Sequence, residues 1–516
     1  MDQRKSSTNL VVAGLLLGMF VGALDQTIVS TAMPTIVTEL GGFEFYVWVF
    51  SAYMIATVVA TPIFGKLSDI YGRKIFFQLG LFIFLLGSIL CGIAESMTEL
   101  IIYRAIQGIG GGALMPIAFA VIFDIFPPEK RGKMNGLFGA VFGLSSVFGP
   151  SLGAYITDYI DWRWVFYINI PIGIVALGLI HFGYREAKAQ RRQKIDWGGA
   201  TMLVTAILSF MFAIELGGAE TYAWGSWQII GLFVLFAVSF LLFLVIERKV
   251  SDPIVELKLF KSRLFTTSQA IGFFYGILMV SGATYIPLFI QGVYGESASA
   301  AGQVLTPMML AVVASSMAGG PLVNKMSYRS IMMISTVILA VAMVLLGSMT
   351  VDTPRWAVTV YMVLVGLGIG VNFVVLNISV LHGLPNQYKG AAISLITFFR
   401  TIGSALGVTV LGVLQKIDYK DRITSVFPDP AVAEQFSDPR ALLTPTVREA
   451  LAPTVLEDAT KSLAHSISYL FWVSIAIVVI GAIFVILMGK ARMELPDKSG
   501  AGVQGEEHMQ PGPVGH

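Results

Sequence analysis

Charged residues are scarce in this chain of 516 residues. They make up 13 % of the sequence, whereas hydrophobic residues make up 55 % and the mean hydropathy is +0.77. Because a soluble domain carries about 25 % charged residues, this composition excludes a large soluble enzyme and indicates an integral membrane protein. The formal net charge of +2 is too small to predict nucleic-acid binding.

Cysteine and histidine are also rare. The single cysteine, Cys91, lies in an apolar run, which excludes a disulfide framework and a thiolate metal site. The five histidines are scattered: His181, His382, His465, His508 and His516. Residues 108–112 (GIGGG) resemble part of a phosphate-binding loop but lack the Lys-Ser/Thr that should follow. We therefore expect no enzyme, no metal centre and no cofactor.

Long apolar runs fill most of the chain. A membrane-spanning helix needs about 20 mostly apolar residues, and this length predicts roughly fourteen spans. They lie near residues 10–34, 46–66, 75–94, 98–122, 134–157, 163–183, 197–217, 227–247, 265–291, 301–323, 329–350, 355–380, 390–414 and 465–489. The predicted fold class is an all-α integral membrane protein. The first run has no small-residue cleavage site, so we expect a retained span and not a signal peptide.

Lysine and arginine are concentrated in alternate loops between these spans. The basic loops contain Lys66, Arg73, Lys74, Lys130, Arg131, Lys133, Arg185, Lys188, Arg191, Arg192, Lys194, Arg248, Lys249, Lys258, Lys261, Arg263, Lys325, Arg329 and Lys389. The opposite short loops are mainly acidic, with Arg163 and Arg355 as exceptions. Because such a bias marks cytoplasmic loops, the basic side and both termini are predicted to be cytoplasmic.

Asp25 interrupts the first apolar run, where it is the only charge between Lys5 and Glu39. A carboxylate deep in an apolar helix costs about 2.5–3.5 kcal/mol on insertion scales. Such a residue usually faces a bundle interior or a water-filled cavity, so we expect Asp25 to face a central cavity and to be functional.

Residues 65–74 and 320–329 form a degraded internal repeat. Aligning the two loops pairs Gly65 with Gly320, and Asp69 with Asn324. Transporters often contain such repeats. The repeat predicts two six-helix bundles, with the spans near 197–217 and 227–247 outside them.

This reading divides the chain into four parts. The parts are an N-terminal bundle (1–184), two inserted helices with basic flanks (185–263), a C-terminal bundle (264–490) and a disordered tail (491–516). The C-terminal bundle is expected to include a long extracytoplasmic loop at 415–463, with a short helix near 446–451.

Four motif sets follow one another along the chain. They are LDQTIVSTAMP at 24–34 with DWRWVFYINIP at 161–171, GKLSDIYGRK at 65–74, RAIQGIGGG at 104–112, and GLSSVFGPSLG at 143–153. With these motifs the chain closely resembles the major facilitator superfamily, specifically its fourteen-helix drug:proton antiporter branch, up to about residue 490. The resemblance implies the major facilitator fold and the export of lipophilic, often cationic, drugs or dyes by alternating access, with the proton as coupling ion.

The resemblance also assigns roles to residues. It implies proton coupling at Asp25 and Arg104. It implies conformational gating by Gly65, Asp69, Gly72, Arg73 and Lys74. It implies that Gly143, Gly149, Pro150 and Gly153 shape the interface between the two halves. The residues themselves leave simpler alternatives: Arg104 could extend to the outer membrane surface, the 65–74 loop could be a plain basic anchor, and the glycines could simply permit tight packing.

Other polar or aromatic side chains are candidates for lining a central cavity. They are Phe20, Trp48, Tyr53, Glu215, Phe273, Tyr285, Asn372 and Phe373. Glu215 could instead be solvated at the membrane interface, and Asn372 and Asn377 could form hydrogen bonds between helices. We expect Arg400 to be buried and paired. The tryptophans of the 161–164 segment are expected to anchor the outer membrane face and to shape its loop.

The expected protein is a monomeric multi-pass component of a bacterial cytoplasmic membrane. Its partners would be small lipophilic molecules and the lipid bilayer, with no nucleic acid. Two other functions remain open: a carrier for one metabolite (a siderophore, an amino acid or a lipid), and a non-transporting membrane sensor.

Overall fold

The computed structural model describes residues 7–41, 45–186, 196–218, 222–385, 388–426, 448 and 452–493. Helices are the only regular elements in this part of the chain. The long helices are α1 (Thr8–Leu40), α2 (Tyr46–Tyr71), α3 (Arg73–Gly92), α4 (Met97–Ile125), α5 (Pro128–Tyr159), α7 (Asn169–Gly183), α8 (Trp197–Gly218), α9 (Trp227–Lys249), α10 (Arg263–Gly292), α11 (Ala298–Lys325), α12 (Tyr328–Gly347), α13 (Arg355–Ser379), α14 (Lys389–Val426) and α17 (Pro453–Leu487). Two short helices, α6 (Trp164–Tyr167) and η2 (Leu257–Lys261), precede α7 and α10.

Serine residues fix the beginnings of several helices. The side chains of Ser96, Ser226, Ser262, Ser297 and Ser327 each accept a hydrogen bond from the amide three residues later. A serine at this position satisfies an amide that would otherwise have no partner in the first helical turn. These serines follow polar loops in the sequence and therefore set where the apolar spans begin.

Fourteen helices of the described chain are long and apolar enough to cross a membrane, α6 and α7 together counting as one of them. This confirms the number of spans predicted from the apolar runs. The described chain begins and ends at the same end of the molecule, as an even number of spans requires. Ser7 donates to the Gly183 carbonyl at 3.1 Å, and the Ala491 carbonyl accepts from Tyr328 at 3.0 Å.

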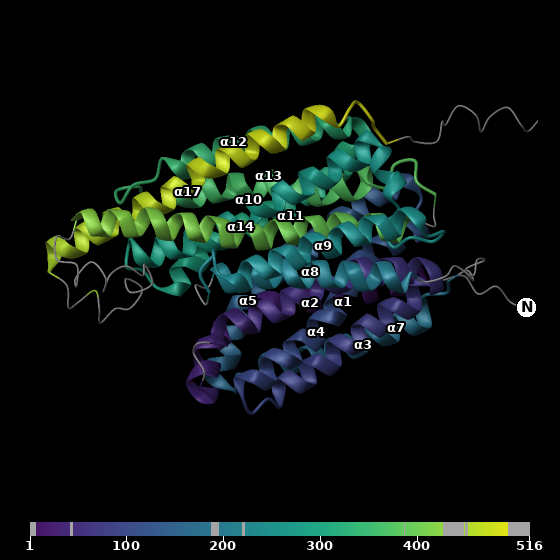
Figure 1. Cartoon of the computed structure of the whole chain (residues 1–516), viewed down its shortest axis with the longest axis horizontal. Helices are drawn as coiled ribbons and strands as arrows, with labels where there is room; N and C mark the ends of the chain where they lie inside the picture. The colour runs from purple at the N-terminus through teal and green to yellow at the C-terminus, as the bar shows by residue number, and fades with distance from the viewer. Residues whose placement is uncertain are drawn as a thin grey trace, which may run out of the picture.

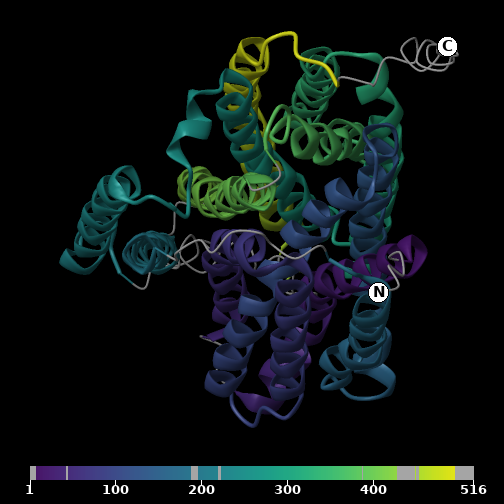
Figure 2. The same cartoon turned by 90° about the vertical axis from the view of Figure 1, so that its right-hand side faces the viewer.

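The helices form two groups and a flanking pair (Figures 1 and 2). Helices α1–α7 pack together, as do α10–α14 with α17, whereas α8 and α9 pack mainly on each other. Figure 2 shows this pair beside the two groups. The groups meet chiefly where α5 lies against α11 and where α2 lies against α14.

The predicted loop at 415–463 is wrong at both of its ends. Helix α14 continues to Val426, and α17 begins at Pro453. The added turns of α14 carry a buried stripe at Gln415, Tyr419 and Ile423, which is the spacing of one helix face. Because charged residues lie between the stripe positions, the average hydropathy of this segment is low, and the sequence therefore predicted a loop here.

The middle of that loop and the C-terminal tail fall largely outside the described residues, which include neither 427–447, 449–451 nor 494–516. The short helix expected near 446–451 is therefore represented by Arg448 alone. Its guanidinium donates to the Gly292 carbonyl at 2.5 Å.

Candidate functional site

Asp25 and Arg104 form an ion pair inside the first helix group. Arg104 Nη1 of α4 lies 2.5 Å from Asp25 Oδ2 of α1, and the two side chains are 1 % and 0 % exposed. All partners of Asp25 described below belong to the same helix group. The prediction that Asp25 faces a central cavity is therefore wrong for this structure, because an ionised carboxylate is better stabilised by a buried cation and hydrogen-bond donors.

The second carboxylate oxygen of Asp25 accepts hydrogen bonds from two amide side chains. Gln107 Nε2 of α4 donates to Asp25 Oδ1 at 2.8 Å, and Asn169 Nδ2 of α7 donates to it at 3.1 Å. The hydroxyl oxygen of Ser88, on α3, accepts from the same two amides at 2.7 and 3.2 Å. Three donors from two helices thus surround the Asp25 carboxyl group.

The Arg104 guanidinium also has several partners besides Asp25. Its Nη1 donates to Gln107 Oε1 at 2.6 Å, and its Nε donates to the Val49 carbonyl at 3.4 Å. Its Cζ lies 4.3 Å from the centre of the Tyr53 ring, a cation–π arrangement. Arg104 therefore does not extend to the membrane surface. Tyr53, expected as a cavity residue, belongs to this buried centre.

The sequence reading missed Ser88, Gln107 and Asn169 as parts of the centre. Each is an uncharged polar residue in an otherwise apolar span, and each is fully buried. That pattern was visible in the sequence. What was not visible is that α3, α4 and α7 bring these side chains to α1.

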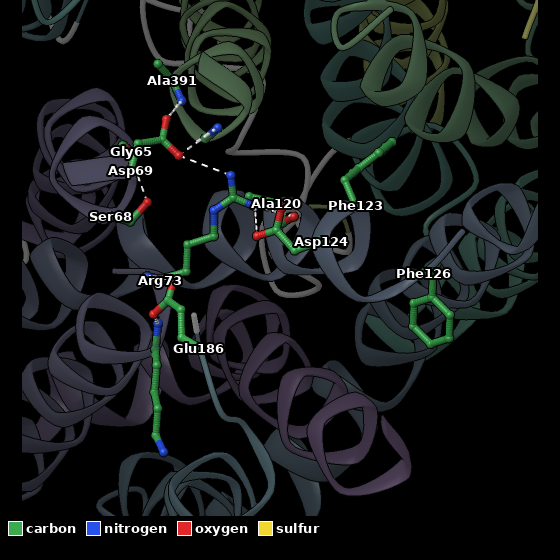
Figure 3. Close-up of polar contacts among 12 residues, drawn as sticks. Gly65, Ser68, Asp69, Arg73, Ala120, Phe123, Asp124, Phe126, Glu186 and Ala391 are labelled. Carbon is green, nitrogen blue, oxygen red and sulfur yellow. Dashed lines mark hydrogen bonds and ion pairs between the residues drawn. The ribbon is translucent and has the colours of Figure 1, made fainter. Parts of the chain in front are cut away.

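Asp69, near the end of α2, joins the two helix groups (Figure 3). Its Oδ1 accepts from the Gly390 amide at 3.1 Å, and its Oδ2 accepts from the Ala391 amide at 2.9 Å. These amides belong to the first turn of α14, where N–H groups lack partners within their own helix and the helix dipole favours negative charge. We call this contact the Asp69 latch.

Arg73 ties the latch to the end of α4. Its Nη2 lies 3.2 Å from Asp69 Oδ1, and its Nη1 donates to the Ala120 carbonyl at 2.5 Å. The same Nη1 also pairs with Asp124. The Asp69 and Arg73 side chains are 2 % and 5 % exposed, so they form a buried charge network and not a plain surface anchor.

Other residues of the 65–74 loop contact the end of the first helix group and helix α14. Gly72 has φ of 111°, which only glycine adopts readily, and thereby lets α2 turn into α3. Glu186 accepts from the Arg73 amide at 2.7 Å and from the Lys74 amide at 3.1 Å. Lys74 Nζ donates to the Tyr184 carbonyl at 2.7 Å. Gly65 faces Ser394 of α14 so closely that a Cβ would collide with it.

The glycines of α5 divide between two neighbours. A Cβ at Gly143 would lie 2.6 Å from Val313 of α11, so this position does belong to the interface between the groups. Gly149 and Gly153 instead face Thr27 and Thr31 of α1. Their predicted place between the two halves is therefore wrong, because the C-terminal half of α5 packs within its own group; Pro150 lies inside the helix between them.

The cavity candidates Trp48, on α2, and Glu215, on α8, each contact a residue of the other helix. The rings of Trp48 and Phe212 lie 5.6 Å apart, and Glu215 forms a side-chain hydrogen bond with Ser51. These contacts fasten the flanking pair of helices to the first group. Phe20, on α1, is partly buried, and its carbonyl accepts from Ser145 Oγ of α5 at 3.4 Å.

Most candidates in the second group are helix-packing residues. Asn372 Nδ2 donates to the Gly368 carbonyl at 2.7 Å and to Ser335 Oγ of α12 at 3.2 Å, the alternative that the sequence left open. Tyr285 donates to the Val408 carbonyl at 3.1 Å. The backbone of Phe273 lies against Gly403.

Phe373 and Arg400 behave differently from these residues. The ring of Phe373, on α13, lies 5.5 Å from the ring of Phe142 on α5, across the boundary between the groups. Arg400 Cζ, on α14, lies 4.4 Å from the Phe373 ring centre. Within the described chain Arg400 has no ion pair, so the prediction of a paired arginine is wrong there. Both amide atoms of Asn377 also lack a hydrogen-bond partner among the described residues.

The 161–164 segment closes the other end of the first group. Trp162 is 2 % exposed and donates from Nε1 to Glu39 Oε2 at 2.8 Å. Arg163 Nη1 lies 2.6 Å from Glu39 Oε1. Hydrogen bonds from Arg163 and Trp162 hold the pKa of Glu39 below its usual value. Trp162 is thus a packing residue, whereas Trp164 is 52 % exposed.

Known proteins with similar sequences cover nearly the whole chain. Multidrug resistance protein 3 of Bacillus subtilis (strain 168) is 48 % identical over 497 residues, which are 95 % of this chain and 97 % of the relative. The multidrug transporter protein MdtP of the same organism is 36 % identical over 509 residues, covering 94 % of each chain.

Solved structures and a family model give the same fold. The proton:xylose symporter XylE superposes with a TM-score of 0.63 at 13 % identity, covering 93 % of this chain and 95 % of the symporter. Identity this low supports the fold alone. The model of the Major Facilitator Superfamily matches residues 15–408. The chain therefore belongs to the Major Facilitator Superfamily, a family of membrane transporters, and is a multi-pass membrane protein and not an enzyme.

Proposed function

We propose that this protein is a proton-coupled antiporter that exports lipophilic, often cationic, small molecules by alternating access. The observation that carries the proposal is the buried Asp25–Arg104 pair, because ionisable residues inside spans mark proton and substrate pathways. The names of the two Bacillus relatives support drugs as the substrate class.

The proposed orientation places the Asp69 latch at the cytoplasmic face. The basic loops gather at that end, as expected for cytoplasmic loops, and the described chain starts and finishes there. The protein would work as a monomer in a bacterial cytoplasmic membrane.

The proton would act on Asp25. Protonation removes the negative charge that holds Arg104, and Gln107 and Asn169 then face a neutral carboxyl group. A buried arginine without its partner is strongly destabilised, so this step favours a rearrangement of α4 relative to α1. Loss of the proton restores the pair and the arrangement seen here.

Helix α4 would connect this step to the latch. It carries Arg104 at one end and Asp124 at the other, where Asp124 pairs with Arg73. The two residues are 20 positions apart, about 30 Å along a helix. A shift of α4 therefore reaches Arg73, and through Arg73 it reaches Asp69.

The structure would represent a state closed at the cytoplasmic face. The contacts between the groups run from the Asp69 latch and the Gly132–Gly320 contact to Gly143, and beyond Gly143 the α5 glycines face α1. Opening toward the cytoplasm requires Asp69 to leave the amides of α14. The membrane potential supplies about 2.3 kcal/mol per charge per 100 mV, to which a pH gradient adds.

The test is transport of ethidium into inside-out vesicles energised by a proton gradient. Asp25→Asn keeps the shape of the side chain but removes its charge, so we expect gradient-driven uptake to fall to the level of empty vesicles. Asp158→Asn, at an exposed position, is the matched control and should transport normally. Normal uptake by Asp25→Asn, or wild-type uptake that persists after a protonophore, would contradict the proposal.

A further inference from the structure

Arg400 is a partly exposed cation that has no counter-charge among the described residues. Among the residues that the structure describes, no carboxylate or carbonyl pairs with its guanidinium. Its Cζ lies 4.4 Å from the centre of the Phe373 ring. Arg104 provides the comparison, because its guanidinium is occupied by Asp25, Gln107 and the Val49 carbonyl.

Arg400 lies at the boundary between the two bundles. The Phe373 ring that it contacts also lies 5.5 Å from the Phe142 ring of the opposite bundle. A Cβ at Gly139, also on α5, would come within 4.0 Å of Phe373. Arg400 itself is partly exposed. Parting of the bundles would therefore uncover two aromatic faces beside a free guanidinium.

These groups have a definite chemical preference. A guanidinium presents five N–H donors in a planar fork that matches a carboxylate or another planar oxyanion. In a surrounding of low dielectric constant, such donors bind an anion more strongly than they do in water. Phenylalanine faces favour flat apolar groups. A ligand that satisfies all three side chains is an aromatic ring system carrying a carboxylate.

We propose that Arg400, Phe373 and Phe142 form a subsite for aromatic carboxylates or zwitterions in the transported molecule. The inference rests on the proposed function and extends the substrate class beyond cations. It also separates two tasks within the chain: Arg104 stays bound to Asp25 in the first bundle, whereas Arg400 in the second is free to meet a ligand.

The experiment measures equilibrium binding to the purified full-length protein in detergent by calorimetry. The probes are 2-naphthoate and 2-naphthamide, which share their ring and differ in charge, so partition into micelles is controlled. We expect the wild type to prefer naphthoate by about tenfold or more, as hydrogen bonds to a charged group imply. Arg400→Gln should remove this preference by weakening naphthoate binding, with naphthamide binding changed by less than about twofold.

Two further variants test whether the planar guanidinium of Arg400 itself is responsible for the preference. Arg400→Lys keeps the charge but loses the planar fork, so its preference should be intermediate. Arg422→Gln, on the same helix but bonded to Asp418, should bind both probes as the wild type does. If Arg400→Gln aggregates, Arg400→Met replaces it and carries the same expectation.

The inference is overturned if the wild type binds the two probes equally, or if Arg400→Gln and Arg400→Met retain the naphthoate preference. An equal loss of both probes also overturns it, because that result means general damage to packing. Failure of the proposed function looks different: ethidium uptake would be independent of the proton gradient, whatever the naphthoate result.

Discussion

The 65–74 loop and its repeat at 320–329 meet the opposite bundle in different ways. In the first, the Asp69 carboxylate accepts from two amides of α14. In the second, the aligned residue is Asn324, whose buried Oδ1 has no hydrogen-bond partner among the described residues. There the contact is made by glycine backbones, since a Cβ at Gly320 would lie 2.8 Å from the Lys133 amide nitrogen.

The starts of the two facing helices explain part of this difference. Helix α14 offers the free amides of Gly390 and Ala391 to a carboxylate. Helix α5 begins at Pro128 after Pro127, and in its first turn the Lys130 amide already donates to the Pro127 carbonyl at 3.0 Å. One copy of the duplicated contact therefore depends on charge, and the other depends on close approach of two helices. We expect the charged copy to control opening.

The largest effect should follow from removing the charge of the latch. Asp69→Asn weakens charge-assisted hydrogen bonds, each worth about 1.5–3 kcal/mol, so the closed state should lose roughly a factor of ten or more in relative population. Spin labels at Lys130 and Lys325, two exposed positions on opposite bundles beside the Gly132–Gly320 contact, would report the change as a longer distance distribution. Turnover should fall, with substrate affinity nearly unchanged.

Asn324→Ala is the matched control in the second copy. Its side chain has an unsatisfied oxygen, so turnover and distance distribution should change by less than about twofold, as for most substitutions outside special contacts. Equal effects of Asp69→Asn and Asn324→Ala would show that the two copies are equivalent and would break the comparison.

A smaller effect is expected where the second copy depends on close approach. The Cβ of Gly132→Ala would lie 2.6 Å from the Gly320 carbonyl oxygen, so the two backbones must move apart. Overpacking of this kind should destabilise the closed state by about 1–2 kcal/mol, and turnover measured in vesicles should fall accordingly.

Gly302→Ala is the control for this substitution. Gly302 lies on α11, and a Cβ there would have nothing within 4 Å. Alanine also favours a helix over glycine by about 1 kcal/mol, so stability should stay equal or rise slightly. Loss of turnover in Gly302→Ala, or normal turnover in Gly132→Ala, would contradict the view that transport depends on close packing of Gly132 against Gly320.

The contrast between the loops also indicates what sequence reasoning could reach. Apolar runs of sufficient length predicted the spans, because the membrane imposes their length. The buried Asp25 stood out because charge is rare in such runs. The partners of Asp69 could not be found in this way, because they are backbone amides about 320 positions later. Nearly every residue has a backbone amide, so the residue type does not reveal such a donor.

Other differences have the same physical origin. A buried stripe at 415–423 continues α14 although its sequence is mostly polar. Asp25 turned out to lie inside its own bundle because three neighbouring helices contribute four polar side chains, and only packing decides which of them meet. The lack of an ion pair at Arg400 among the described residues is likewise a property of the spatial arrangement.

The smallest effect is expected at the opposite end of the first bundle, where a charged contact stays within one bundle. Hydrogen bonds from Arg163 and Trp162 lower the pKa of Glu39. A carboxyl group with a lower pKa in the folded state stabilises the fold above its unfolded pKa, about 4.3, and this contribution is lost as the pH falls through the folded pKa. Glu39→Gln should therefore lower the free energy of unfolding at pH 7, but by less than about 1 kcal/mol because the pair is partly exposed.

The pH dependence separates this contact from the Asp69 latch. Thermal unfolding in detergent should show a small difference between Glu39→Gln and the wild type at pH 7, which shrinks as the pH falls below the unfolded pKa of Glu39 and is lost below its folded pKa. Turnover should remain normal, because Glu39, Trp162 and Arg163 all belong to the first bundle and need not separate when the bundles part. If Glu39→Gln slowed transport as much as Asp69→Asn does, control of opening would not be confined to the charged contact that crosses between the bundles.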